Sequence, residues 1–97
     1  MKYKTTIEKV YTFHNDPGHG WLEVDRAEIN ALGISDKISG YSYQRSGKVY
    51  LEEDLDAGIF LRARFGDIPS AIGHIKDVYT YCSSPIRNYQ SYRKEWA

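Results

Sequence analysis

Two histidines and an aspartate lie within six residues of one another, at His14, Asp16 and His19. Imidazole and carboxylate groups are common metal ligands. Their spacing matches no standard metal motif, and the intervening Pro17-Gly18 is typical of a turn. A metal site here would need a further ligand from elsewhere, such as His74 or the acidic residues near position 52. The segment is therefore a weak metal candidate, and a solvated loop explains it more simply.

A second group of candidate residues is acidic. Carboxylates can act as general acids and bases, bind Mg²⁺ or attract a basic partner. Acidic residues also favour the first turn of a helix, and this role explains Asp54 and Asp56 without any ligand. Of the ligand uses, we favour capture of a basic surface over catalysis. The group comprises Glu23, Glu52, Glu53, Asp54 and Asp56.

The single cysteine, Cys82, cannot form an internal disulfide, which favours a cytoplasmic protein. Free cysteines are mostly buried, so we expect Cys82 to be a small core residue. The chain contains no nucleophile elbow, no glycine-rich phosphate loop and no Cys-x-x-Cys pair. The sequence therefore carries no signature of covalent catalysis.

Basic and aromatic residues alternate near the C-terminus, at Arg87, Tyr89, Tyr92 and Arg93. Such a pattern can hold single-stranded nucleic acid by charge and base stacking. It also suits a segment that docks its rings on the core while its charges stay in water. The net charge is zero, with 13 basic and 13 acidic residues, which favours docking. Residues 83–97 could form either a C-terminal helix or an extended arm.

The clearest local structure is a hairpin that starts at Tyr41. Apolar and polar residues alternate on both sides of Ser46-Gly47, which is typical of two strands joined by a tight turn. Tyr41 and Tyr43 share one face of the first strand. Tyr50 falls on the opposite face from its neighbours Val49 and Leu51, so we expect that face also to be covered.

A helix is predicted directly after the hairpin. Asp54 is a suitable N-cap, and Gly66 can end the helix in a left-handed conformation. Leu55, Ile59 and Ala63 recur every four residues, with Phe60 beside them in sequence. This spacing predicts that the stripe faces the core.

The N-terminal part predicts a strand over 7–13, a turn at 15–18 and a short strand over 21–24. Asp25 and Glu28 have the spacing of a capping box, and Gly33 suits the end of the short helix that follows. A last strand is predicted by the β-rich residues at 75–81.

Ninety-seven residues make one domain, 1–97, with room for a modest core. No apolar run reaches the roughly 20 residues of a membrane span. The elements predict an α+β fold in the order ββαββαβ. We expect a mainly antiparallel sheet of about five strands, with two helices on one face.

Several segments resemble a group of short, uncharacterised bacterial proteins carried on mobile DNA such as prophages, plasmids and gene cassettes. The resemblance covers most of the chain, to about residue 89, and has no known activity attached. It implies an accessory role, in which small binders, including some that block host defence systems, are common. The similar segments are His19–Val24, Leu32–Ile34, Asp36–Ser39, Tyr41–Tyr43 and Val49–Ala57.

These observations favour a small non-catalytic binding protein without a cofactor, able to form a homodimer. A nucleic-acid binder that uses the C-terminal segment is the alternative, and a small metal-dependent enzyme at His14, Asp16 and His19 is the third. The expected binding residues are the exposed aromatic, acidic and basic candidates Tyr41, Tyr43, Tyr50, Glu52, Glu53, Arg87, Tyr89, Tyr92 and Arg93.

Overall fold

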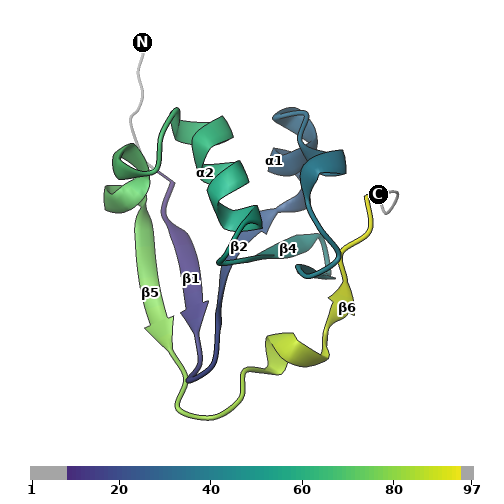
Figure 1. The fold of residues 1–97 in the computed structure, drawn as a ribbon, viewed down its shortest axis with the longest axis vertical. Coiled ribbons are helices and arrows are strands. Elements are labelled where there is room, and N and C mark those ends of the chain that lie inside the picture. The colour runs from purple at the N-terminus through teal and green to yellow at the C-terminus, as the bar shows by residue number, and fades with distance from the viewer. Residues whose placement is uncertain (1–8, 95–97) are drawn as a thin grey trace.

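The computed structural model describes residues 9–94, which form a small α+β domain around one mixed sheet (Figure 1). Within these residues the sheet has six strands, in the order β5-β1-β2-β4-β3-β6. Neighbouring strands are antiparallel except β5, which runs parallel to β1. The strands are β1 (Tyr11–Asn15), β2 (Gly20–Asp25), β3 (Tyr43–Arg45), β4 (Lys48–Glu52), β5 (Ile75–Tyr79) and β6 (Gln90–Ser91).

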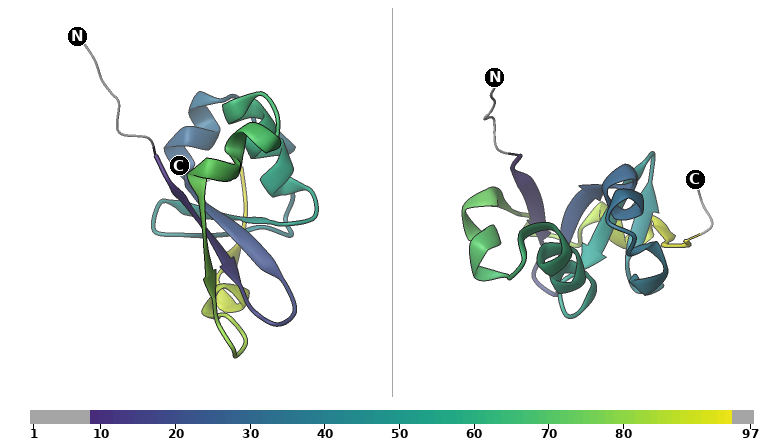
Figure 2. Two further views of the ribbon diagram at one scale, coloured as in Figure 1. Left: turned by 90° about the vertical axis from the view of Figure 1, so that its left-hand side faces the viewer. Right: turned by 90° about the horizontal axis from the view of Figure 1, so that it is seen from above.

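The two helices, α1 (Arg26–Ala31) and α2 (Asp56–Phe65), lie on the same side of the sheet (Figure 2). This arrangement confirms the predicted α+β class and the packing of both helices on one face. The strand count is one higher than expected because the C-terminal segment adds β6. Short 3₁₀ turns lie between the larger elements, at η1 (Ser35–Lys37), η2 (Pro69–His74) and η3 (Pro85–Asn88).

The first hairpin forms as predicted, but β1 begins and ends later than expected. It covers Tyr11–Asn15, whereas the prediction was 7–13, of which residues 7 and 8 lie outside the described range. The capping box at α1 is present, with the Asp25 N–H donating to Glu28 Oε1 at 3.1 Å. Gly33 follows α1 in a left-handed conformation, with φ of 71°.

The second hairpin turns at Ser46 and Gly47, as predicted. Both residues have positive φ, 52° and 81°, as in the two-residue turns that match strand twist. The Gly47 carbonyl accepts the N–H of Arg26 at 2.9 Å, which ties this turn to the start of α1.

The predicted core stripe of α2 is right in its middle and wrong at both ends. Phe60 is fully buried and Ile59 packs against the core, whereas Leu55 and Ala63 are exposed. The buried side is formed by Ala57, Phe60 and Leu61, because the helix begins at Asp56 and is capped from the preceding strand. Gly66 ends the helix with φ of 92°, as predicted.

The core lies between the sheet and the helices. Alternate residues of a strand point to opposite faces, so Leu22 and Val24 join the core while Trp21 and Glu23 point away from it. We call these the helix-covered face and the arm-covered face. The arm is residues 83–92, which include η3 and β6, and it packs rings and an arginine against Trp21 and Tyr50.

Candidate functional site

The predicted combination of His14, Asp16 and His19 does not form a metal site. Asp16 is buried, and its carboxylate is occupied by Arg87: Nε donates to Oδ2 at 2.7 Å and Nη2 donates to Oδ1 at 2.8 Å. Backbone N–H groups of Ser84, Gly18 and His19 also donate to it, at 2.8, 2.9 and 3.0 Å. The Arg87 hydrogen bonds and the Ser84 N–H hold the pKa of Asp16 well below its ordinary value.

His14 lies on the arm-covered face, away from this carboxylate. Its Nε2 is 2.8 Å from Glu23 Oε1, and its ring centroid is 6.0 Å from that of Tyr50. Burial, followed by the nearby Glu23 charge, raises the pKa of Tyr50 to about 12. Glu23 therefore contacts His14 and Tyr50 and does not line the groove beside Glu52 and Asp54. The predicted five-member acidic cluster divides into two parts.

The other part of the cluster surrounds the start of α2, where Glu52 acts as the cap. Its Oε1 accepts the N–H groups of Leu55 and Asp56 at 2.8 and 2.7 Å, and its Oε2 accepts that of Asp54 at 2.7 Å. The prediction that Asp54 is the N-cap is therefore wrong. Oε1 is saturated by these donors, while Oε2 keeps one acceptor site.

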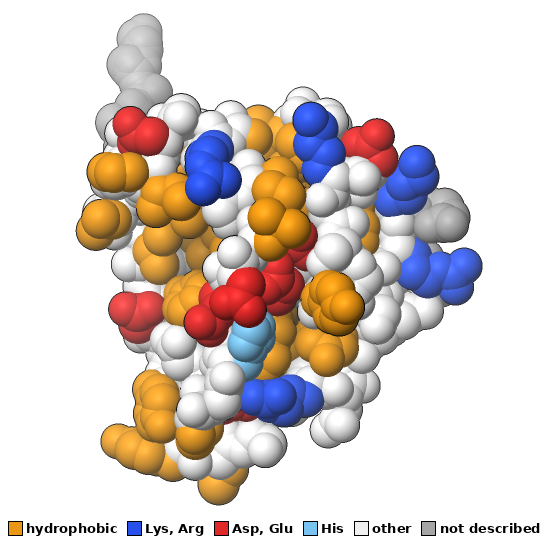
Figure 3. Space-filling view, in the orientation of Figure 1, with side chains coloured by type: hydrophobic (Ala, Val, Ile, Leu, Met, Phe, Trp, Pro, Cys, Tyr) orange, Lys and Arg blue, Asp and Glu red, His pale blue; other side chains and the backbone are white. Residues whose placement is uncertain are grey.

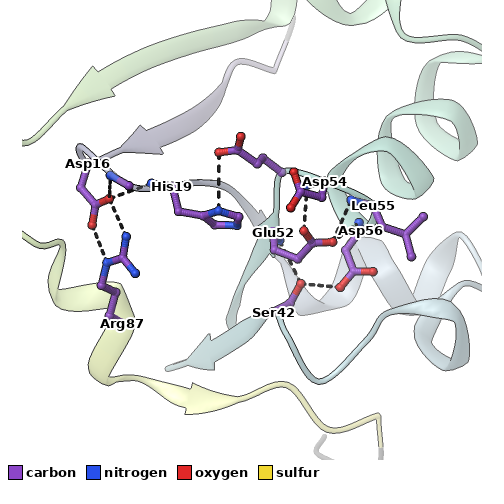
Figure 4. Close-up of polar contacts among 10 residues, drawn as sticks. Asp16, His19, Ser42, Glu52, Asp54, Leu55, Asp56 and Arg87 are labelled. Carbon is purple, nitrogen blue, oxygen red and sulfur yellow. Dashed lines mark hydrogen bonds and ion pairs between the residues drawn. The ribbon is translucent and has the colours of Figure 1, made fainter.

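Asp56 is fully buried behind Glu52 and holds the preceding loop. Its Oδ2 accepts hydrogen bonds from Ser42 Oγ and Ser39 Oγ, both at 2.6 Å, and from the Ser39 N–H at 3.0 Å. Ser42 Oγ in turn accepts the Glu52 N–H at 3.0 Å. Figure 4 shows Glu52, Ser42 and Asp56 as one chain of contacts running from β4 to the first turn of α2. Glu52 and Asp56 thus have structural roles that fix the loop around Tyr41.

A groove of about 590 Å³ opens beside this cap. Figure 3 shows the surface of the protein in the orientation of Figure 1. Carboxylates gather in the middle of this view, next to a histidine and between hydrophobic side chains. Tyr41 and Leu55 both line this groove and are 83% and 57% exposed, so it offers apolar surface beside its carboxylates. We call this the acidic groove, and its lining residues are His19, Trp21, Ser39, Tyr41, Tyr43, Glu52, Asp54, Leu55 and Arg87.

The acidic groove is negative in its electrostatics. Glu53 and Asp54 are exposed at its edge, and Glu53 Oε1 is 3.9 Å from His19 Nδ1. Arg87 brings a positive charge to the opposite side, but Asp16 pairs with it. Its guanidinium carbon also lies 5.2 Å from the centre of the Trp21 ring. The unpaired negative charge therefore belongs to the side formed by residues 52–54.

One group of potential metal ligands forms among residues 9–94. His19, Glu52 and Asp54 each have a ligand atom within 4.8 Å of those of the others. In this group His19, one of the predicted metal candidates, lies next to two of the acidic residues, as a metal site at this loop would require. Glu52 has one free acceptor site after capping α2, so the group offers a cation few oxygen atoms.

The predicted binding residues of the C-terminal segment take part in internal packing. Tyr92 is buried, and its hydroxyl donates to the Ser35 carbonyl at 2.6 Å. The Tyr89 ring lies 5.1 Å from that of Tyr50 and under the Arg45 guanidinium. The Arg93 N–H donates to Gln44 Oε1 at 2.9 Å. Of the two forms predicted for this segment, the described part is the arm rather than a helix.

Cys82 is exposed, so the prediction of a buried cysteine is wrong. It follows the end of β5 and precedes the arm, where the chain leaves the sheet. Sequence reasoning also missed Leu55 and Trp21 as parts of a site. Leu55 could have been recognised only if the cap had been assigned to Glu52. With that assignment the helix begins at Asp56, and Leu55 lies outside it.

The helices formed by residues 9–94 are too short and too polar for any of them to cross a membrane. Comparisons with protein-family models, curated proteins and solved structures find no match to this chain. The candidate site is therefore interpreted from its own geometry.

Proposed function

We propose that this is a small non-catalytic binding protein that holds a basic side chain of a protein partner in the acidic groove. One observation carries the proposal. The exposed Tyr41 and Leu55 line a groove of about 590 Å³ together with the carboxylate of Asp54, and the exposed Glu53 precedes Asp54 in the chain. Apolar anchors next to unpaired charge are the combination that interfaces use for recognition.

Arginine and lysine fit this combination because each has an apolar stem and a cationic end. The stem can lie along Leu55, and the rings of Tyr41 and Tyr43 can receive the cation on their faces. The free acceptor site of Glu52 and the Asp54 carboxylate can then accept its hydrogen bonds.

The roles of the carboxylates support binding rather than acid–base chemistry. Glu52 holds the first turn of α2, and Asp56 holds Ser39 and Ser42. Such fixed groups make a rigid acidic wall, and a rigid site loses little conformational entropy when a partner binds. An accessory binder in the cytoplasm also suits the implied relationship to mobile-element proteins.

The test uses two capped glycine-serine peptides, one with three arginines and one with three glutamates, titrated into the ¹⁵N-labelled protein. We expect the arginine peptide to shift the amide signals of residues 39–43 and 52–56. Tyr41→Ala should weaken its binding roughly fivefold, as the loss of about 1 kcal/mol predicts. Asp54→Asn should weaken it and reduce its salt dependence.

The matched control is Asp36→Asn, which removes the same charge from η1, outside the acidic groove. Equal binding of the glutamate peptide, or arginine binding that Tyr41→Ala and Asp54→Asn leave unchanged, would overturn the proposal. Binding of single-stranded DNA that Arg93→Gln and Lys94→Gln weaken would favour the C-terminal segment instead. Shifts confined to His19 and Asp54 on adding Zn²⁺ alone, with no peptide binding, would favour a metal site.

A further inference from the structure

We propose that β5 is a self-association edge, on which a second copy of this chain adds its own β5 in antiparallel orientation. This inference does not depend on the acidic groove. The sheet ends on one side with β6, which has two residues, and on the other with β5, which has five. An edge strand exposes unpaired backbone groups that can pair with another strand, and β5 is the edge long enough to do so.

Apolar side chains collect at both ends of this edge. Val78 is 39% exposed on the strand, and Tyr81, just after it, is 86% exposed. Tyr79 and Tyr81 pack edge to face, with ring centroids 4.9 Å apart. At the other end, Ile72 of η2 is 67% exposed. An antiparallel two-fold contact brings the tyrosine end of each copy to the isoleucine end of the other, so one surface serves both partners.

The backbone direction limits how two such strands can pair. The Thr80 N–H donates to the Asn15 carbonyl at 2.7 Å, so the backbone groups of Thr80 point toward β1. Since alternate residues point their backbone groups to the same side, Val78 also points toward β1. Asp77 and Tyr79 therefore point their N–H and C=O groups outward.

Charge then selects the register. A two-fold axis perpendicular to the sheet places each residue of one copy opposite a residue of the second copy. The two side chains then lie on the same face of the joined sheet. Centring the pair on Lys76 or Asp77 would place like charges directly opposite each other, which is destabilising. Centring it on Ile75 or Tyr79 would pair only one residue of each β5 with β5 of the other copy. A centre on Val78 avoids the like charges and pairs residues 77–79 of each β5 with each other.

In the Val78 register, the outward groups of Asp77 meet those of Tyr79 in the second copy, and each such pair exchanges both backbone hydrogen bonds. Val78 lies opposite Val78 of the second copy, in a close pair without hydrogen bonds. Ile75 lies opposite Tyr81, and Lys76 and Asp77 lie opposite Thr80 and Tyr79, so no like charges face each other directly.

The first test is sedimentation equilibrium of the full-length protein. We expect a dimer that Val78→Lys dissociates, with affinity falling at least tenfold, because two ammonium groups would then lie opposite each other. Asn30→Lys is the control, since it adds the same charge at an exposed residue of α1, outside β5 and the acidic groove. A wild-type protein that stays monomeric at about 1 mM, or a dimer unaffected by Val78→Lys, would overturn the proposal.

The second test reads the register directly, in a Cys82→Ser background. Opposed residues in a close antiparallel pair have Cα atoms about 4.5 Å apart, within the range that a disulfide spans. Val78→Cys should therefore form a symmetric intermolecular disulfide in air. Lys76→Cys should not, because the two Lys76 positions would lie about 14 Å apart along the strands. Efficient linking at Lys76, or none at Val78, would show that the register is wrong.

Discussion

The two faces of the sheet are covered in different ways. On the helix-covered face, Val49, Leu51 and Phe60 are fully buried in a continuous apolar cluster. On the arm-covered face, one ion pair between Asp16 and Arg87 fixes the arm over aromatic rings. Apolar burial responds little to pH, whereas an ion pair depends on the protonation of its carboxylate. The arm should therefore loosen under conditions that leave the helices in place.

The largest effect should come from Phe60→Ala on the helix-covered face. Phe60 is fully buried, with its ring centroid 5.4 Å from that of Tyr11. Removing the ring should lower the free energy of unfolding by about 3–5 kcal/mol, through lost burial and the cavity left behind. Urea denaturation at pH 7 measures this loss, and a change below about 1 kcal/mol would mean that this face is not the main core.

A smaller and more local effect should follow from Asp16→Asn, which leaves Arg87 without its ion-pair partner. The Tyr92 N–H, which donates to the Ser42 carbonyl at 2.8 Å, should exchange with solvent on the order of tenfold faster. Amides of β2 and β4 should change much less. Asp67→Asn, an equal charge change in the exposed segment after α2, should leave the exchange of the Tyr92 amide as it is in the wild type.

The same substitution predicts a pH dependence. The pKa of Asp16 in the folded protein lies below its unfolded value of about 3.9. The ion pair therefore stabilises the fold fully above that unfolded value, and this contribution disappears as the pH falls through the lower folded pKa. Asp16→Asn should remove this part of the acid sensitivity, as urea denaturation between about pH 2 and 6 would show. Identical pH profiles for both proteins would contradict the assigned role of the ion pair.

Tyr92→Phe should have a moderate effect at the junction of the two faces. It removes the hydroxyl that donates to the Ser35 carbonyl at 2.6 Å, while the ring stays in place. The free energy of unfolding should fall by about 0.5–1.5 kcal/mol, the usual net value of one hydrogen bond, when measured in urea at pH 7. A loss as large as that of Phe60→Ala would show that the substitution also disturbs the Tyr92 ring, which lies in the same buried cluster as Phe60.

The smallest effect should appear only in alkaline solution, at Tyr50. Its pKa is raised to about 12, mainly by burial. A raised pKa stabilises the protein below the unfolded value of about 10, and this stabilisation is lost as the pH rises through the folded value. Absorbance at 295 nm should show a tyrosine ionisation step near pH 12 that is lost in Tyr50→Phe. An unchanged titration would mean that the arm does not bury Tyr50.

Local signals in the sequence predicted local structure well. The Ser46-Gly47 turn, the Asp25–Glu28 capping box and the glycines at 33 and 66 all occupy their expected places. Each depends on the conformation of a few adjacent residues, which composition reports directly. These signals were enough to establish the α+β class and the order of most elements.

Features that join distant segments could not be predicted. Asp16 and Arg87 are 71 residues apart, so nothing near Asp16 indicated that its carboxylate was occupied. Glu52 caps α2 from the end of a strand, a role for which Asp54 was the more conventional residue. Assigning the cap to the wrong carboxylate moved the predicted core stripe onto Leu55 and hid the acidic groove.

The sheet order has a consequence for how the chain is made. A nascent chain that has emerged as far as α2 contains β1, β2, β3 and β4, with β1 and β3 as its two open edges. Both are covered by strands from one later segment, β5 at one side and β6 at the other. Open edges invite pairing with other chains. Until residues 75–91 have left the ribosome and paired, β1 and β3 therefore stay open to pairing with other chains.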